Sequence, residues 1–218
     1  MRFADANDLL KPGYLPFESG YRPLDDGTWT AAALTRMPGC RAKMVDWWFS
    51  WVGDIETYRL WHPTDHVWSG WENRIDGKYI GAAHLAHEYF GKDSPLYRLR
   101  IAFHDPAETF DAGLYRASGH FAICARTGPI DEPVYLSRSC HFVRETDYGC
   151  EMRSRFWLGH IAHRDSALAI PEARVRELRA GLGGDRARRL HQHCAEEMGY
   201  LAEILPTLYR RVTLDNLV

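Results

Sequence analysis

Two residues near the C-terminus have the types and the spacing of a metal-ligand pair. His193 and Glu197 are four residues apart in a segment with helical periodicity, so their side chains lie on one helical face and can reach a common ion. The apolar stripe of this segment steps through Leu190, Cys194, Glu197, Leu201 and Leu205. A carboxylate in such a stripe needs a cation, a salt bridge or a proton. Metal ligation is one solution, and an exposed His–Glu pair or an ion pair with Arg155 are the alternatives.

A second group of candidate ligands lies between Tyr58 and His66. His62 and His66 are four residues apart, but Pro63 interrupts any regular helix between them. Either histidine is therefore a candidate ligand, and either could equally be an ordinary loop residue. The neighbouring Asp65 could support a ligand rather than bind the ion itself.

A third group lies in a segment whose alternation predicts a strand. Alternation places His84, Ala86 and Glu88 on one face and Leu85, His87 and Tyr89 on the other. If the first face points inward, Glu88 is a buried carboxylate that needs a partner cation. If it points outward, Glu88 is an ordinary surface residue.

A single histidine in a later strand adds a further candidate. His141 lies among apolar neighbours between Cys140 and Phe142. Such a histidine can be structural, it can donate or accept a hydrogen bond to a substrate, or it can bind a metal.

Together these groups form a ligand set from separate elements of the chain: His66, Glu88, His193 and Glu197. Two imidazoles and two carboxylates suit Zn²⁺ or another divalent ion and leave a position for water or substrate. Since the set contains no thiolate, it is more typical of a hydrolytic than of a structural site.

The elements that position these residues follow from periodicity and turn residues. Helices are expected at 43–52, 55–60, 171–180 and 185–205, and strands at 79–89, 96–103, 114–126, 134–143 and 151–158. Consecutive strands without intervening helices favour an antiparallel sheet. We therefore expect an α+β helix-grip fold, with a curved antiparallel sheet wrapping a long C-terminal helix. Residues 1–36, rich in Pro and Gly, are expected as an extended arm, and residues 37–218 as the catalytic domain.

Composition excludes several classes of protein. The formal net charge is −2, and the short basic group Arg186, Arg188 and Arg189 is expected on a solvated helix face, so no nucleic-acid partner is predicted. No apolar segment is long enough to span a membrane, and no secretory signal is recognisable. The five cysteines are odd in number and lack a C-x-x-C pair, which favours a reducing cytoplasm.

Several motifs resemble one enzyme family in order and spacing. They are Met44-Val-Asp-Trp-Trp-Phe, Tyr58-Arg-Leu-Trp-His-Pro-x-x-His66, His87-Glu88-Tyr89, His141-Phe-Val-Arg-Glu-Thr-Asp-x-Gly, Arg153-Ser-Arg-Phe-Trp-Leu-Gly, and His193-Cys-x-Glu-Glu-Met with Leu-Pro-x-Leu-Tyr209. Over residues 37–210 the chain is similar to the diacetylphloroglucinol hydrolase and phloretin hydrolase family.

The resemblance implies a fold, an activity and a site. The fold is Bet v 1-like, and the reaction is hydrolysis of the carbon–carbon bond between an acyl group and a phloroglucinol-type phenolic ring, with release of a carboxylic acid. The implied zinc ligands are His66, Glu88, His193 and Glu197, and the implied partner is a small aromatic acylphenol. The resemblance further implies that Tyr58 is an active-site tyrosine and that His141 contacts the substrate.

Two positions depart from the family pattern. Phe156 stands where the family has a second active-site tyrosine, and Ser69 stands where it has an asparagine, so substrate identity can differ. The N-terminal region looks shorter than the separate domain of diacetylphloroglucinol hydrolase, which leaves a homodimer as an open expectation. A helix-grip binding protein for aromatic ligands and a metal-dependent polyketide cyclase or lyase are the alternative functions.

Overall fold

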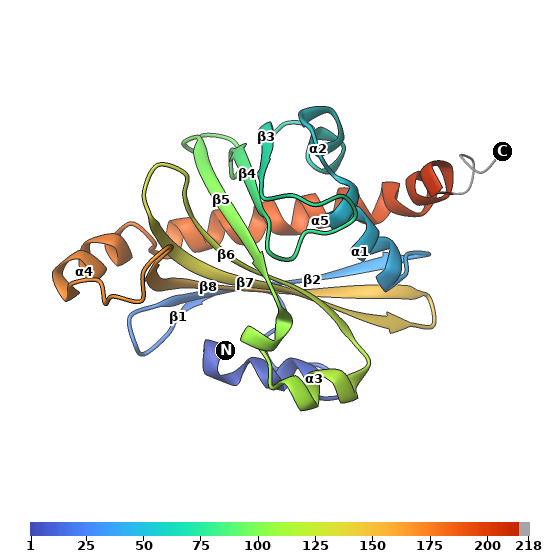
Figure 1. The fold of residues 1–218 in the computed structure, drawn as a ribbon. Helices are drawn as coiled ribbons and strands as arrows, with labels where there is room; N and C mark the ends of the chain where they lie inside the picture. Colours follow the sequence, from blue (N-terminus) through green and yellow to red (C-terminus); the bar gives the residue numbers. More distant parts are fainter. Residues whose placement is uncertain (214–218) are drawn as a thin grey trace.

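The apolar stripe near the C-terminus forms the central helix of the molecule. In the computed structural model, which describes residues 1–213, helix α5 spans Gly184–Thr213 and buries Cys194, Met198, Leu201 and Leu205. Figure 1 shows α5 running along the whole body, with α4 (Glu172–Ala180) beyond its N-terminal end. The last part of the expected catalytic domain, residues 214–218, lies outside the described residues.

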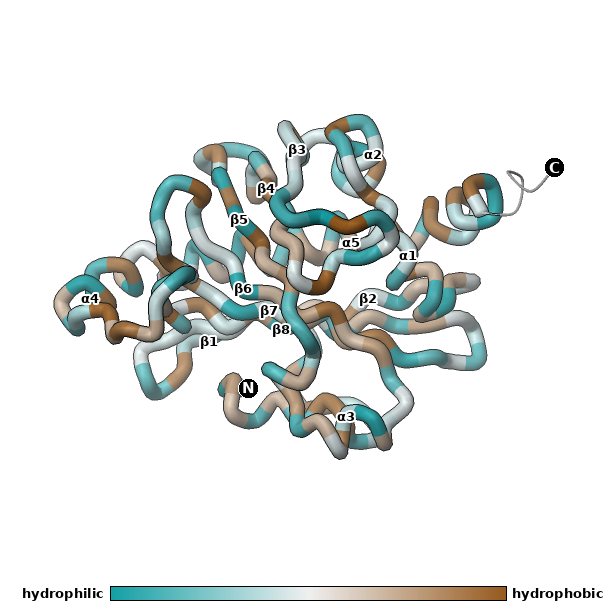
Figure 2. The backbone as a smooth tube through the Cα atoms, viewed as in Figure 1, coloured by the Kyte–Doolittle hydropathy of each residue, from teal (hydrophilic) through white to brown (hydrophobic). Residues whose placement is uncertain are grey.

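One antiparallel sheet of eight strands wraps this helix. The strands have the order β1-β2-β8-β7-β6-β5-β4-β3. Their bounds are β1 Gly20–Pro23, β2 Trp29–Pro38, β3 His66–Glu72, β4 Ala83–Glu88, β5 Tyr97–His104, β6 Phe121–Pro129, β7 Val134–Thr146 and β8 Gly149–His163. Hydrophilic and hydrophobic residues alternate along the first part of β5, as Figure 2 shows, whereas β8 is buried on both faces over most of its length. The expected α+β helix-grip fold is confirmed.

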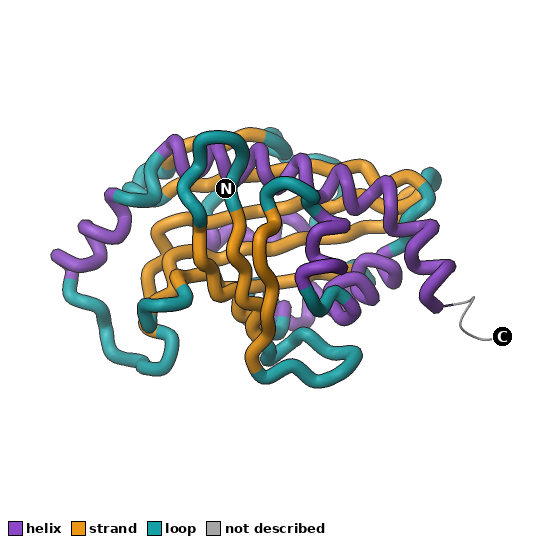
Figure 3. The backbone as a smooth tube through the Cα atoms, turned by 90° about the horizontal axis from the view of Figure 1, so that it is seen from above, coloured by secondary structure: helices purple, strands orange, loops and turns teal. Residues whose placement is uncertain are grey.

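The two faces of the sheet bury different parts of the chain. The inner face packs on α5 and on α1 (Ala42–Trp51), while α2 (Ile55–Trp61) packs on β3 and α5. The outer face is covered by the 3-10 helix η1 (Phe3–Leu10) and by α3 (Ala112–Ser118), around the buried Leu9, Phe142 and Trp157. Figure 3 shows the long helix α5 lying across the strands, and Figure 1 shows η1 and α3 on the other side of the sheet. A short 3-10 turn, η2 (Pro106–Glu108), precedes α3.

The N-terminal region is more ordered than an extended arm. It contains η1, β1 and most of β2, and β2 pairs with β8 over ten positions from Trp29↔Leu158 to Pro38↔Gly149. The expected boundary after residue 36 therefore falls inside a strand. Buried small residues at 31–33 let β2 pack closely under α5, and the pairing with β8 makes the segment a strand.

Three local assignments differ from the sequence pattern. Residues 114–118, expected as the start of a strand, belong to α3, because the Asp111 side chain accepts hydrogen bonds from the backbone N–H groups of Gly113 and Leu114 at 2.9 and 2.8 Å. Gly119, at φ 66°, ends this helix. Residues 79–82 form a turn before β4, and β3 was not expected from the pattern. None of the helices in residues 1–213 combines the length and apolarity needed to cross a membrane.

Candidate metal centre and active-site cavity

His66 is held with one ring nitrogen free. Helix α2 starts at a capping box formed by Asp54 and Thr57 and ends before Pro63, so the chain turns and His66 becomes the first residue of β3. Its Nδ1 donates a hydrogen bond to the backbone carbonyl of Tyr58 at 2.8 Å. Since a carbonyl can only accept, the proton is on Nδ1 and the lone pair of Nε2 faces inward.

His193 is oriented in the same way by a different partner. Its Nδ1 lies 3.1 Å from Oδ2 of Asp65, and the same carboxylate oxygen accepts a hydrogen bond from the backbone N–H of Gly91 at 2.7 Å. The Nε2 of His193 points toward Oε2 of Glu197, one helical turn later, at 3.7 Å. A carboxylate behind an imidazole is a typical support of a histidine ligand.

Glu88 completes the group from the end of β4. It lies opposite His66 in the β3–β4 register, and its Oε2 is 3.8 Å from Nε2 of His66. The buried hydroxyl of Tyr58 donates a short hydrogen bond to the same oxygen. The Tyr58 ring also stacks on His66, with ring centroids 3.6 Å apart and an interplanar angle of 5°, so one tyrosine holds two members of the group.

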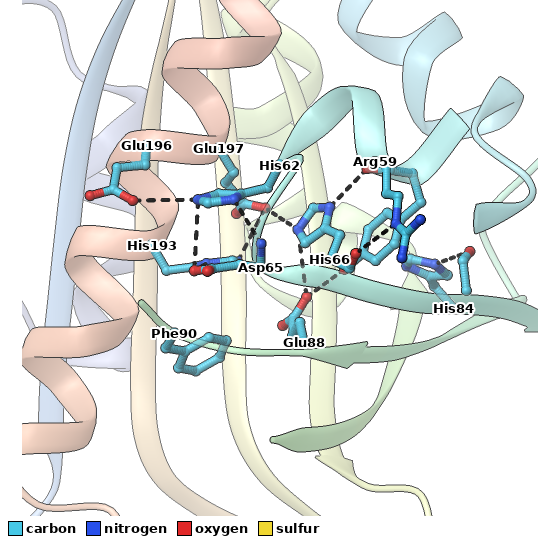
Figure 4. A network of polar contacts seen from close by, with 12 residues as sticks. Arg59, His62, Asp65, His66, His84, Glu88, Phe90, His193, Glu196 and Glu197 are labelled. Atoms are coloured by element: carbon cyan, nitrogen blue, oxygen red, sulfur yellow. Dashed lines mark hydrogen bonds and ion pairs between the residues drawn. The ribbon is translucent and has the colours of Figure 1, made fainter. Parts of the chain in front are cut away.

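Three of these side chains, those of His66, His193 and Glu197, are close enough to hold a metal ion, and Glu88 lies beside His66. The ligand atoms of His66, His193 and Glu197 lie within 4.8 Å of one another, and Nε2 of each histidine is buried without a hydrogen-bond partner among the described residues. Figure 4 shows the imidazoles of His66 and His193 and the carboxylates of Glu88 and Glu197 facing one another. These groups are all acceptors, so they repel unless a cation or a proton lies between them.

The pKa of His193 reflects this demand for positive charge, whereas that of His66 reflects its burial. Burial alone would lower the pKa of His193, but the hydrogen bond to Asp65 and the charges of Glu197 and Glu88 raise it to about 9. For His66, burial outweighs the attraction of Glu88 and lowers the pKa to about 4. Burial also raises the pKa of the Glu197 carboxyl. A proton on His193 thus occupies the place that a metal cation would take.

His62 offers no free lone pair to such an ion. Its Nδ1 accepts a hydrogen bond from the backbone N–H of Asp65 at 3.2 Å, and its Nε2 lies 3.4 Å from Oε2 of Glu196 (Figure 4). His62, Asp65 and His193 form a second group close enough for an ion. However, the Asp65 oxygen in that group is already used by His193 and Gly91. The geometry favours His66 over His62 as the ligand. Asp65 supports His193 through the hydrogen bond to its Nδ1.

Three of the four candidate ligands, Glu88, His193 and Glu197, line an aromatic cavity of about 320 Å³. Tyr58, which contacts both His66 and Glu88, also lines it. The aromatic part of the wall comes from Phe49, Trp61, Trp71, Phe90, Phe103 and Phe156. The volume lies at the lower end of the range for small-molecule sites, about 300–1,000 Å³, and a mainly apolar wall with a few polar groups is their usual composition.

His141 and Phe156 meet on the cavity side of β7 and β8. The Nδ1 of His141 lies 2.8 Å from the hydroxyl of the buried Ser154, and burial lowers the pKa of His141 to about 4. The ring of Phe156 contacts His141 edge-on, with centroids 5.7 Å apart. His141 is thus a neutral imidazole facing the cavity, and Phe156 places an apolar ring beside it.

Ser69 lies behind the cavity wall rather than in it. Its hydroxyl is 2.9 Å from Nε2 of His84, and His84, not Ser69, lines the cavity. Burial lowers the pKa of His84 to about 3, and its ring lies between those of Trp71 and Tyr58 at 4.8 Å from each. Strand alternation had placed His84 on the face of Glu88, so the sequence contained the signal for this residue.

The predicted position of Arg186 was wrong. It was expected on a solvated helix face, and Arg188 and Arg189 do lie there, each paired with Asp185 at 2.8 Å. Arg186 instead lines the cavity, with its guanidinium over the ring of Tyr97. Its spacing of seven residues before His193 could have revealed this, because positions two helical turns apart share a face.

Comparisons with known proteins identify relatives of this chain. A family model described as the DAPG hydrolase PhiG domain matches residues 1–210, which includes the segment expected as an arm. The chain is 30% identical to a 2,4-diacetylphloroglucinol hydrolase from a Pseudomonas species over 227 residues, covering 94% of this chain and 75% of that protein. It is 26% identical to phloretin hydrolase from Eubacterium ramulus, covering 87% of this chain and 70% of that protein.

Among solved structures, the chain is similar to protein Ms6760 from Mycobacterium smegmatis. The TM-score is 0.48 at 13% sequence identity, with 87% of this chain and 98% of that chain covered.

Proposed function

The chain belongs to the DAPG hydrolase PhiG domain family, and on this premise we propose that it hydrolyses the carbon–carbon bond between an acyl group and a phloroglucinol-type phenolic ring. In this reaction water supplies the oxygen that turns the acyl group into a carboxylic acid, and the ring carbon receives a proton. The substrate is a small aromatic acylphenol, and the proposed cofactor is Zn²⁺ or another divalent ion.

The observation that carries the proposal is the pair of buried Nε2 atoms of His66 and His193, which have no hydrogen-bond partner among the described residues and face the carboxylates of Glu88 and Glu197 beside an aromatic cavity. We assign His66, Glu88, His193 and Glu197 as the residues that hold the metal. When bound, a divalent ion supplies Lewis-acid polarisation of oxygen in the reacting groups.

Tyr58 and His141 are proposed to act on the substrate from two sides. The Tyr58 hydroxyl keeps its proton, since burial and the Glu88 charge raise its pKa, and it holds that proton at the Glu88 oxygen. His141, fixed by Ser154, presents its other ring nitrogen to the cavity, where it can hydrogen bond to the acyl or phenol oxygen. Both residues can therefore orient the ring and assist proton transfer to it.

The aromatic wall is proposed to bind the flat ring and to exclude water from it. Trp71 and Phe103 stack on one another with centroids 5.9 Å apart and both line the cavity. Offset aromatic contacts of this kind recognise a planar ligand. Phe156 and Ser69, where the family has tyrosine and asparagine, reduce the number of polar partners, so the substrate preferred here can differ from those of the relatives.

Metal analysis is the first test of this proposal. Purified protein supplied with zinc is expected to contain one divalent ion per chain by mass spectrometry of the elements, and His193→Ala is expected to lose it. Absence of metal from the unchanged protein would contradict the metal-dependent hydrolase mechanism. A helix-grip binding protein would then be the better interpretation.

Turnover of acylphloroglucinols is the second test, with a matched pair of variants on α5. Glu197→Gln is expected to lose metal and to stop release of the carboxylic acid, whereas Glu196→Gln, one residue earlier and 59% exposed at the side chain, should retain both. If a metal-containing protein converts the acylphenol without releasing an acid, the cyclase or lyase alternative is supported. Equal activity of the two variants would contradict the ligand assignment.

A further inference from the structure

Arg186 lies on the stripe of α5 that faces the cavity. This stripe consists of Arg186, Leu190, His193 and Glu197, all of which line the cavity. Arg186 precedes His193 by two helical turns, or roughly 10 Å along the helix axis. The guanidinium of Arg186 therefore lies on the same wall as His193 and Glu197. Its distance from them along the helix is comparable to the length of a small aromatic ligand.

The guanidinium of Arg186 is packed against rings rather than against acids. Its central carbon is 3.5 Å from the ring centroid of Tyr97 and 4.9 Å from that of Phe90. The Phe90 ring in turn is 4.9 Å from the ring of His193. The nearest polar partner of the guanidinium is the hydroxyl of Tyr97, and the attraction of Glu88 reaches it only from farther away; no carboxylate of residues 1–213 forms an ion pair with Arg186. Arg188 and Arg189 on the same helix both have such a partner in Asp185.

A cation in a mainly apolar wall is costly unless a counter-charge compensates it. Burial lowers the pKa of Arg186, which reflects this cost, and the two aromatic faces offset only part of it. The planar guanidinium retains donors that match an anionic oxygen or a carboxylate. A ligand that brings an anion to this point would supply the missing partner.

We propose that Arg186 binds an anionic oxygen on the aromatic ring of the ligand and selects ionised rings over neutral ones. The inference rests on the proposed function and deepens it. When the acyl–ring bond breaks, its electron pair passes to the ring and is shared with the phenol oxygens before the ring carbon takes a proton. A guanidinium beside one of those oxygens stabilises both the bound phenolate and the departing ring. A ring carboxylate would present the same chemistry.

Binding of three aromatic probes that carry no acyl group tests this role without turnover. The probes are para-nitrophenol at a pH where its absorbance shows the phenolate, its neutral methyl ether para-nitroanisole, and para-nitrobenzoate. Dissociation constants are measured by quenching of tryptophan fluorescence for the metal-containing protein, for Arg186→Met, and for Arg188→Met as a matched control on the exposed face of α5. Metal content is measured for each protein.

Arg186→Met is expected to weaken binding of an anionic probe by about ten- to a hundred-fold, the usual effect of losing a hydrogen bond to a charged group, and to leave nitroanisole binding and metal content unchanged. Selective loss of nitrophenolate binding identifies a phenolate as the anion, and selective loss of nitrobenzoate binding identifies a carboxylate. Equal loss for nitroanisole, or no loss for either anion, would overturn the proposal, as would an equal effect of Arg188→Met. Because no probe is hydrolysed, a failure of the proposed hydrolysis would not alter these outcomes.

Discussion

A buried ion-pair cluster fastens the N-terminal region to the strand that carries part of the cavity wall. Glu18 lies between Arg153 and Arg155 of β8, with Oε1 2.6 Å from Nη2 of Arg153 and a hydrogen bond from Arg155 to Oε2 of 2.5 Å. Both arginines are fully buried. Alternate residues of the same strand, Ser154 and Phe156, face the catalytic side, so the cluster supports the site from behind.

Glu18→Gln is expected to destabilise the protein by about 3 kcal/mol at neutral pH. Burial alone would raise the pKa of Glu18, but the two guanidinium groups outweigh it and lower the pKa to about 2 from an ordinary value of 4.5. One pKa unit corresponds to about 1.4 kcal/mol, which gives about 3 kcal/mol for this difference. Removing one partner of a buried pair typically costs a similar 3–5 kcal/mol or so, because the remaining charges stay buried.

The pH dependence has a definite sign. The pKa of Glu18 is lower in the folded state, so its stabilisation is fully present above about pH 4.5 and is lost as the pH falls toward 2. Urea unfolding of the unchanged protein and of Glu18→Gln should therefore differ most at pH 7 and progressively less below pH 4.5.

Asp185 provides a matched control, since it also pairs with two arginines, Arg188 and Arg189, but at the exposed start of α5. Asp185→Asn should change the free energy of unfolding much less than Glu18→Gln does, because solvent screens exposed pairs. If the two variants lost the same stability, or if the loss in Glu18→Gln were independent of pH, the reasoning from burial would be refuted.

Three further predictions concern the site. Asp65→Asn should weaken metal affinity by about 10–100-fold in a chelator competition, as loss of a carboxylate behind a histidine ligand does elsewhere; unchanged affinity would mean that Asp65 does not orient His193. Tyr58→Phe should retain metal but lower kcat by about 10²–10⁴-fold if its hydroxyl assists proton transfer, and a kcat equal to that of the unchanged protein would exclude that role. Phe156→Tyr should alter the ratio of kcat/KM between two acylphenols that differ in one ring hydroxyl, by about tenfold for one added hydrogen bond; an unaltered ratio would show that position 156 does not contact the ring.

Some of the site followed from local periodicity. Helical spacing placed His193 near Glu197 on an apolar stripe, and strand alternation placed Glu88 on the same face as His84. Both patterns depend only on the geometry of a single element, which a sequence displays directly. The antiparallel sheet and the long closing helix followed for the same reason.

The partners across elements were decided by the tertiary structure. The sequence does not distinguish His62 from His66 as a metal ligand. The fold shows that both ring nitrogens of His62 contact Asp65 and Glu196, while Nε2 of His66 has no hydrogen-bond partner among the described residues. The pairing of Asp65 with His193 joins residues 128 positions apart. No local pattern contains this information, because a ring nitrogen's partner depends on where another element lies.

The environment of charged and apolar residues was likewise decided by packing. Arg186 looked like its neighbours Arg188 and Arg189 in the sequence, yet the rotation of α5 against the sheet turns it alone toward the cavity. Strand β2 forms within a segment rich in glycine and proline because β8 supplies its hydrogen-bond partners. The sequence by itself determined which residues share a face of one element, and the tertiary structure decided which of those faces meet, since contacts between distant segments outweigh local preference.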